Sequence, residues 1–102
     1  MTSTPKEQPI PPDAEGRGDA VEVLRAFVVD GGLSISFMRA FDDPRMWGML
    51  LVDIARHAAR TYEQEGVCSA DEALQQMHEF FEAEVKNPTD PGVTTSRKKQ
   101  GH

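Results

Sequence analysis

The sequence is poor in the residues that several kinds of site and fold require. Its 102 residues include one cysteine, Cys68, one tryptophan and one tyrosine. A single cysteine can form neither an internal disulfide nor a thiolate metal cluster. No apolar run is long enough to span a bilayer, and the N-terminus lacks the basic-then-apolar pattern of a signal peptide. These absences predict a cytoplasmic protein.

Positive charge is also scarce. The chain has 11 Lys and Arg residues against 17 Asp and Glu residues, a formal net charge of −6. Residues 21–86 carry most of the acidic side chains, and an acidic surface repels a phosphate backbone. Nucleic-acid binding would need one face to collect Arg39, Arg45, Arg56 and Arg60. The acidic total makes that function the least favoured.

Both ends of the chain are polar and rich in turn-forming residues. Residues 1–20 contain four prolines and almost nothing to bury, and residues 87–102 read "NPTDPGVTTSRKKQGH". Such segments cannot offset the entropy lost on ordering. We therefore expect disordered tails at 1–20 and 87–102, and a single α+β domain at 21–86.

The first element expected is a β-hairpin over "VEVLRAFVVDGGLSISFMRAF". Two β-branched and aromatic runs flank Asp30-Gly31-Gly32, residues that suit a tight turn. Either Gly31-Gly32 or Asp30-Gly31 could form the loop, and both registers keep the same faces. The inner face would hold Leu24, Ala26, Val28, Leu33, Ile35 and Phe37.

Two helices are expected next. "FDDPRMW" begins the first, with Asp42 or Asp43 as the cap and Pro44 in the first turn, and Gly66 ends it. Its large apolar stripe is Trp47, Leu50, Leu51, Ile54, Ala58 and Tyr62, and a second stripe of small residues is Gly48, Val52, Ala55 and Ala59.

The second helix is expected at about residues 70–86. Ser69 and Glu72 have the spacing of a capping box, and the Asn87-Pro88 pair ends the helix. The short link between the helices makes them an antiparallel hairpin. The fold class predicted is thus α+β: a β-hairpin followed by an antiparallel two-helix hairpin, ββαα.

A lone two-stranded sheet has two bare edges and is barely stable by itself. We therefore predict a homodimer, with a tail or the helices as the alternative cover for the sheet. Candidate residues for a partner surface are Phe27 and Val29 on the outer face of the hairpin and Met46, Met49, Arg56 and Arg60 on the first helix.

A possible ligand site lies on the first helix. Asp53 and His57 are four residues apart, so one lies above the other on the same face. His78 and Glu82 have the same spacing on the second helix, and His57, His78, Asp53 and Glu82 together would suit a divalent metal. The flanks on which the two histidines lie should diverge in antiparallel packing, so a surface pair on the helix is the favoured interpretation. No cofactor and no catalytic residue are expected.

The chain has a family resemblance that is carried by three segments: the hairpin "LRAFVVDGGLSISF", the run "FDDPRMWGMLLVDIARHAARTY" and the following "NPTD". It resembles a family of small uncharacterised alphaproteobacterial proteins, classed as a domain of unknown function, over about residues 22–91. The resemblance implies a cytoplasmic bacterial protein and brings no activity or catalytic residue.

The function expected from the sequence is therefore a non-enzymatic accessory or protein-interaction module that acts as a homodimer. The alternative is a protein that binds a small ligand or a divalent metal around Asp53 and His57, with weak catalysis at most.

Overall fold

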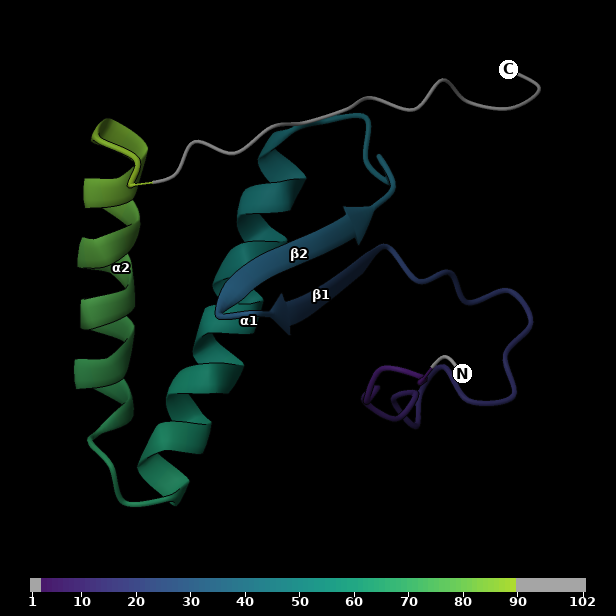
Figure 1. Ribbon diagram of the computed structural model, residues 1–102, viewed down its shortest axis with the longest axis horizontal. Helices are drawn as coiled ribbons and strands as arrows, with labels where there is room; N and C mark the ends of the chain where they lie inside the picture. The colour runs from purple at the N-terminus through teal and green to yellow at the C-terminus, as the bar shows by residue number, and fades with distance from the viewer. Residues whose placement is uncertain (1–2, 90–102) are drawn as a thin grey trace. The chain divides into compact units, whose positions relative to one another are not determined.

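The expected β-hairpin forms in the computed structural model, which describes residues 3–89 (Figure 1). Strand β1 spans Leu24–Val29 and strand β2 spans Gly32–Phe37. They pair antiparallel, with Leu24 opposite Phe37, Ala26 opposite Ile35 and Val28 opposite Leu33. Asp30 and Gly31 make the loop at φ 52° and 79°. Of the two registers that the sequence allowed, the structure adopts the one with Asp30-Gly31 as the loop, in which both central residues have the positive φ of a type I′ turn.

The first helix, α1, spans Arg45–Gln64. At its start the Arg45 N–H donates to Oδ1 of Asp43 at 3.0 Å, so Asp43 and not Asp42 satisfies a free amide. At its end Gly66 has φ 76°, its N–H donates to the Glu63 carbonyl, and the Val67 N–H donates to the Tyr62 carbonyl. This pair of bonds is a Schellman motif, which confirms Gly66 as the terminator.

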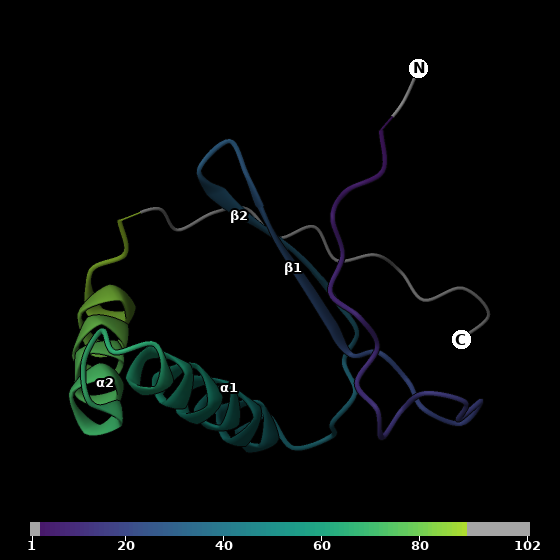
Figure 2. The ribbon, with the colours of Figure 1, turned by 90° about the horizontal axis from the view of Figure 1, so that it is seen from below.

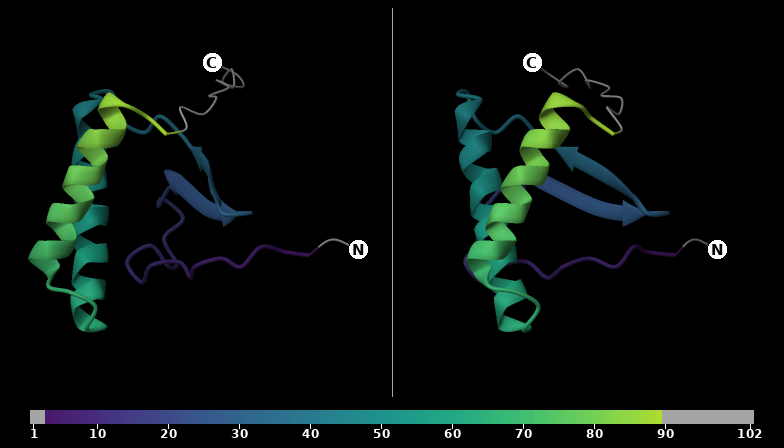
Figure 3. Two further views of the ribbon diagram at one scale, coloured as in Figure 1. Left: turned by 60° about the vertical axis from the view of Figure 1, so that its left-hand side comes forward. Right: turned by 90° about the vertical axis from the view of Figure 1, so that its left-hand side faces the viewer.

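The second helix, α2, spans Ala70–Lys86 and begins with the predicted capping box. The Glu72 N–H donates to Ser69 Oγ at 3.1 Å, and the Ser69 N–H donates to Oε1 of Glu72 at 3.3 Å. A further bond ties the helices together, because the Ala70 N–H donates to Oε2 of Glu63 at 3.3 Å. The helices form the expected antiparallel hairpin (Figures 2 and 3). The ββαα arrangement of an α+β fold is confirmed.

Two small residues are the most buried part of the helical hairpin. Ala59 is 2% exposed and Ala73 is 5% exposed, and they are the fully buried apolar residues of the described part. On the small stripe of α1, Ala59 is buried and Ala55 is half-buried, whereas Gly48 and Val52 are exposed, so α2 covers only the C-terminal half of this stripe. The large stripe is covered only in part, since Trp47, Leu50 and Ala58 are half-buried, whereas Leu51, Ile54 and Tyr62 stay 46–47% exposed. Periodicity identified an apolar stripe correctly but could not say what would cover it.

The chain divides into two compact units, with the boundary between Asp42 and Asp43. The β-hairpin belongs to the first unit and the helical hairpin to the second. The first unit also contains hydrogen-bonded turns within residues 11–20, where the Ala14 N–H donates to the Pro11 carbonyl and the Arg17 N–H to the Ala14 carbonyl. The tail and domain boundaries expected from the sequence stay predictions, and of the second tail only residues 87–89 lie within the described part.

Candidate interaction surface

The first unit exposes the face of the β-hairpin that the sequence predicted to be its inner, apolar face. We call this set the hairpin apolar face: Leu24, Ala26, Val28, Leu33, Ile35 and Phe37. Val28 is 78% exposed, Leu33 68% and Ile35 52%. The alternating pattern placed these side chains on one face, as the register shows, and the first unit itself leaves all of them exposed except the half-buried Leu24.

The opposite face of the hairpin is partly covered by its own unit. The Arg25 guanidinium lies 5.7 Å from the ring centre of Phe27, and it is held by ion pairs of 2.9 Å to both Glu22 and Glu7. Phe27 is half-buried as a result, whereas Val29 remains 55% exposed. Of the two candidate partner residues on this face, Val29 is therefore the more accessible.

The candidate residues on α1 share one side of the helix. We call this set the Met/Arg surface: Met46, Met49, Arg56 and Arg60. Successive members are three, seven and four residues apart, and these spacings return to the same face of a helix. Met49 is 59% exposed and Met46 is 37% exposed, and both arginines are exposed. The candidate ligand residues Asp53 and His57 lie on this same side of α1, so one surface carries both groups of candidates.

Asp53 and His57 do not form the pair that their spacing suggested. Nδ1 of His57 lies 3.1 Å from a guanidinium nitrogen of Arg60 instead. A guanidinium only donates hydrogen bonds, so Nδ1 can take part in this contact only as the acceptor. Within residues 3–89, Asp53 has no hydrogen bond or ion pair. The carboxylate therefore does not orient the imidazole, and this arrangement is not an acid–base dyad.

The alternative metal site is not assembled either. Across the described residues, no group of three or more His, Cys, Asp or Glu side chains comes close enough to hold a metal ion. His57, His78, Asp53 and Glu82 all lie on the helical hairpin, yet the structure does not gather them. Burial explains this, because Ala59 is the buried residue of α1, whereas Asp53 and His57 lie on the exposed side of the helix.

Two arginines of the possible nucleic-acid patch are neutralised locally. Arg45 makes a two-pronged ion pair with Asp43, at 2.8 Å from its terminal nitrogen to Oδ2 and 3.2 Å from Nε to Oδ1, and Arg39 lies 3.5 Å from Asp42. The hydrogen bonds from Arg45 lower the pKa of the Asp43 carboxyl below its usual value of 3.8. Basic side chains that are already paired offer less to a phosphate backbone.

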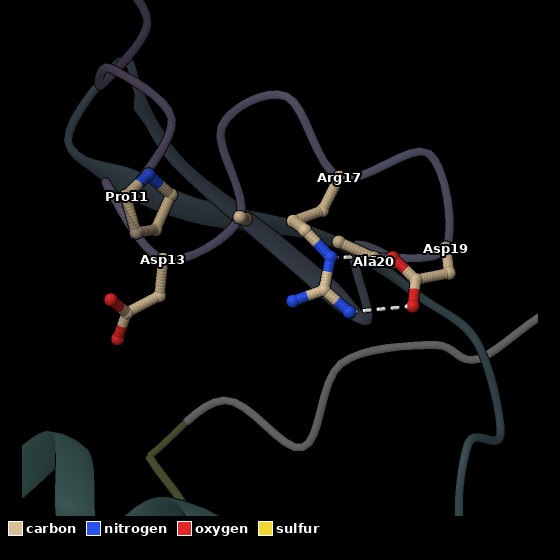
Figure 4. Close-up of a pocket in the computed structure, with 6 residues that line it drawn as sticks. Pro11, Asp13, Arg17, Asp19 and Ala20 are labelled. Atoms are coloured by element: carbon tan, nitrogen blue, oxygen red, sulfur yellow. Dashed lines mark hydrogen bonds and ion pairs between the residues drawn. The ribbon is translucent and has the colours of Figure 1, made fainter.

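A shallow cavity of about 400 Å³ lies in the turns of the N-terminal segment, lined by Pro11, Asp13, Ala14, Arg17, Asp19 and Ala20 (Figure 4). Arg17 points along its rim towards Asp19 and binds both carboxylate oxygens, at 3.0 Å and 2.7 Å. This bidentate pair lowers the pKa of Asp19 and occupies the fork of the guanidinium. None of the candidate residues named from the sequence lines this cavity.

Two structural roles were missed in the sequence. Glu63 joins the two helices through the Ala70 amide, and Glu84 accepts from the Thr89 N–H at 2.9 Å and from the Thr89 hydroxyl at 2.6 Å. The signal for the second role was present, because Asn87-Pro88 turns the chain just after the helix and brings position 89 back towards its last turn.

Neither helix of the described region combines the length and hydropathy needed to cross a membrane.

The chain matches known proteins over nearly its whole length. A family model described as a domain of unknown function (DUF5076) matches residues 7–89, which include the N-terminal turns. A solved structure from the photosynthetic bacterium Rhodopseudomonas palustrus CGA009 is 65% identical, with a TM-score of 0.76 over 96% of this chain and 100% of that chain. That protein is described as a "putative pyruvate dehydrogenase". No curated protein matches the chain.

Proposed function

Because the chain belongs to the DUF5076 family, a domain of unknown function, its role has to be inferred from its surface, and we propose a non-enzymatic interaction module that acts as a homodimer. The single observation that carries the proposal is the exposure of large apolar side chains in both units. In each unit several large apolar side chains stay 46–78% exposed. A protein with so little buried surface needs a partner to be stable.

Both units contribute to the exposed apolar area. The side chains concerned are Val28, Val29, Leu33, Ile35, Phe37, Met38, Met49, Leu51, Val52, Ile54, Tyr62, Phe80, Phe81 and Val85, all between 46% and 78% exposed. Burying a large apolar side chain completely contributes about 1.5–3 kcal/mol. At about 25 cal/mol per Å², this corresponds to roughly 60–120 Å² of surface for each side chain. At about half exposure they offer on the order of 700 Å², spread over several faces of the two units, and a single interface would bury only part of this area.

The Met/Arg surface on α1 is the proposed site for a further protein partner. Exposed methionines adapt to different contact shapes, and Arg56 makes no hydrogen bond or ion pair with any residue in the described range, so its guanidinium is available. A partner with acidic side chains beside an apolar patch would suit this surface. We place this activity in the cytoplasm, since Cys68 has no second cysteine with which to pair.

The description of the Rhodopseudomonas protein names an activity but no residue of this chain. The proposal therefore rests on the surface and not on that description. The ligand-binding alternative around Asp53 and His57 is not supported by a contact between the two side chains, since Arg60 occupies Nδ1 of His57.

Light scattering over a hundredfold range of concentration tests the homodimer. We expect a mass near twice that of the 11.3 kDa chain, falling only at high dilution. A mass of one chain at every concentration would overturn the homodimer.

Capture from native cell extract tests the partner surface. We compare the wild-type chain with Arg56→Glu and with Lys86→Glu, an equal charge reversal on the last turn of α2. We expect Arg56→Glu to lose a protein that the other two chains retain. Loss of no protein, or equal loss in both variants, argues against the Met/Arg surface.

A further inference from the structure

The edge of β2 lacks the features that usually prevent strands from pairing with another chain. Its six residues, Gly32–Phe37, contain no charged residue and no proline, and all six are exposed. Its pairing with β1 is continuous and has no bulge. Proteins commonly protect an edge with lysine, proline, a bulge or a very short strand. An uncharged, regular and exposed edge is a template for another strand.

Strand β1 is less suited to this role. It carries Arg25, and the two ion pairs of Arg25 bring Glu7 of the N-terminal segment against that strand. A second chain that approached β1 would meet these charges. The difference between the strands selects β2 as the pairing edge.

The hydrogen-bond alternation shows which backbone groups β2 presents. The Met38 N–H donates to the Val23 carbonyl at 3.1 Å, so that pair exchanges bonds across the hairpin. Pairs alternate between bonded and non-bonded along an antiparallel ladder, which makes Leu33 and Ile35 members of non-bonded pairs with Val28 and Ala26. Their amide and carbonyl groups therefore point away from β1. Over residues 3–89 no other segment supplies a backbone bond to either residue.

Charge also favours the hairpin as the meeting point of two copies. The whole chain carries a net charge of −6, so two copies repel each other on average. Residues 24–37 contain only Arg25 and Asp30 as charged residues and are neutral overall. Residues 43–89 carry nine acidic against four basic residues, a net charge of −5. Two like-charged chains approach at least electrostatic cost through the neutral segment.

We propose that β2 pairs antiparallel with β2 of a second copy, with Ile35 opposite Ile35 on the twofold axis. This inference rests on the homodimer proposed above and specifies its contact. Leu33 then faces Phe37 of the second copy, and Ser34 faces Ser36. The pairing joins the two hairpins into one four-stranded sheet. Residues directly opposite each other share a face, so the two hairpin apolar faces lie on the same side of that sheet.

The register is chosen by the side chains that it places together. A twofold axis at Ile35 pairs an aliphatic with an aromatic residue, Leu33 with Phe37, and two hydroxyls, Ser34 with Ser36. An axis at Ser34 would instead place Gly32 opposite Ser36 and lose the aromatic contact. Aromatic–aliphatic and hydroxyl pairs are the stabilising cross-strand combinations.

Disulfide trapping in the full-length chain tests both the edge and the register. In a Cys68→Ser background, Ile35→Cys puts two thiols on residues about 5.5 Å apart at Cα, within the range of about 4.4–6.8 Å that a disulfide spans. In Ser34→Cys the two cysteines, one from each copy, are offset by two residues along the strands, and their Cα atoms are roughly 8 Å apart. Val28→Cys is the matched control on β1, on the same face as Ile35 and 78% exposed.

We expect mild oxidation to convert most of the Ile35→Cys chain to a covalent dimer, with at least tenfold less in the other two variants. Trapping through Ser34→Cys or Val28→Cys instead overturns the proposed pairing. If light scattering shows a dimer that Ile35→Cys does not trap, the β2 pairing is wrong and the homodimer stands. If light scattering shows a single chain, the proposed function fails as well.

A second variant removes dependence on thiol chemistry. Ile35→Lys puts like charges opposite each other on the axis and should weaken dimerisation at least tenfold, whereas Val28→Lys adds the same charge on β1, away from the axis. Equal dimer dissociation constants for the two variants overturn the β2 pairing. Circular dichroism of each variant shows whether the helices are retained.

Discussion

The β-hairpin and the helical hairpin of this molecule are stabilised in different ways. The helical hairpin has specific contacts at its turn: a Schellman motif at Gly66, a capping box at Ser69, and the bond from Ala70 to Glu63. The β-hairpin has a backbone ladder and a tight turn, with exposed apolar side chains on its main face. Local hydrogen bonds thus define both shapes, whereas burial within either unit is small. Secondary structure in this chain is therefore specified locally, and further burial must come from contacts outside each hairpin.

The largest effect is expected at the helix–helix contact. Ala73→Leu adds volume at a position that is 5% exposed, and overpacking typically costs about 1–3 kcal/mol. For a domain of this size we expect the melting temperature to fall by about 4–8 °C per kcal/mol, measured by circular dichroism. The matched control is Ala83→Leu on the exposed side of the same helix, which should change it little. Similar melting temperatures for both variants would show that small residues are not required between the helices.

A smaller effect is expected in the turn of the β-hairpin. Gly31 has φ 79°, a conformation that costs an L-residue about 1–2 kcal/mol, so Gly31→Ala should destabilise the hairpin. The expected readout is faster amide exchange in residues 24–37, roughly 5–30-fold, with little change in α2 if the two hairpins are independent.

Gly32→Ala is the control for the turn. Gly32 does not have a positive φ, and an added Cβ would lie 3.6 Å from the Val29 carbonyl oxygen, an ordinary contact. Equal exchange in the two variants would contradict the turn geometry. Faster exchange in α2 as well would show that the two hairpins are energetically coupled.

The smallest effect expected is the response of α1 to acid. The Arg45 side chain lowers the pKa of Asp43 below 3.8, so the ionised form is favoured in the folded state. That stabilisation is complete above the usual pKa and is lost as pH falls through the lowered value. We expect helix content to decline below about pH 4 and Asp43→Asn to weaken this dependence. The control is Asp53→Asn, which removes a carboxylate from the middle of α1 and should retain the pH dependence of helix content of the wild-type chain. If Asp53→Asn weakens that pH dependence as much as Asp43→Asn does, the role of the Asp43 carboxylate at the start of α1 is refuted.

The candidate site shows where inference from sequence reached its limit. Spacing placed Asp53 and His57 on one side of α1, which is correct, but a helix offers each side chain neighbours both three and four residues away. Arg60 lies three residues from His57, and its long side chain reaches Nδ1 at 3.1 Å. Spacing alone cannot choose between two such neighbours. The same limit applied to the start of α1, where Asp42 and Asp43 were equivalent as caps until the structure assigned the bond to Asp43.

The sequence by itself determined the order of elements, their ends and their apolar sides. The turns and helix ends depend on hydrogen bonds and dihedral angles within a few residues, so neighbouring residues suffice to predict them. The residues concerned are Asp30-Gly31, Gly66, Ser69 with Glu72, and Asn87-Pro88. Only the tertiary structure decided that Ala59 and Ala73 make the helix contact and that Leu51 and Ile54 stay accessible. The reason is physical: a periodic pattern fixes the direction in which side chains point, whereas the partner that covers them depends on contacts between segments far apart in the chain or between chains.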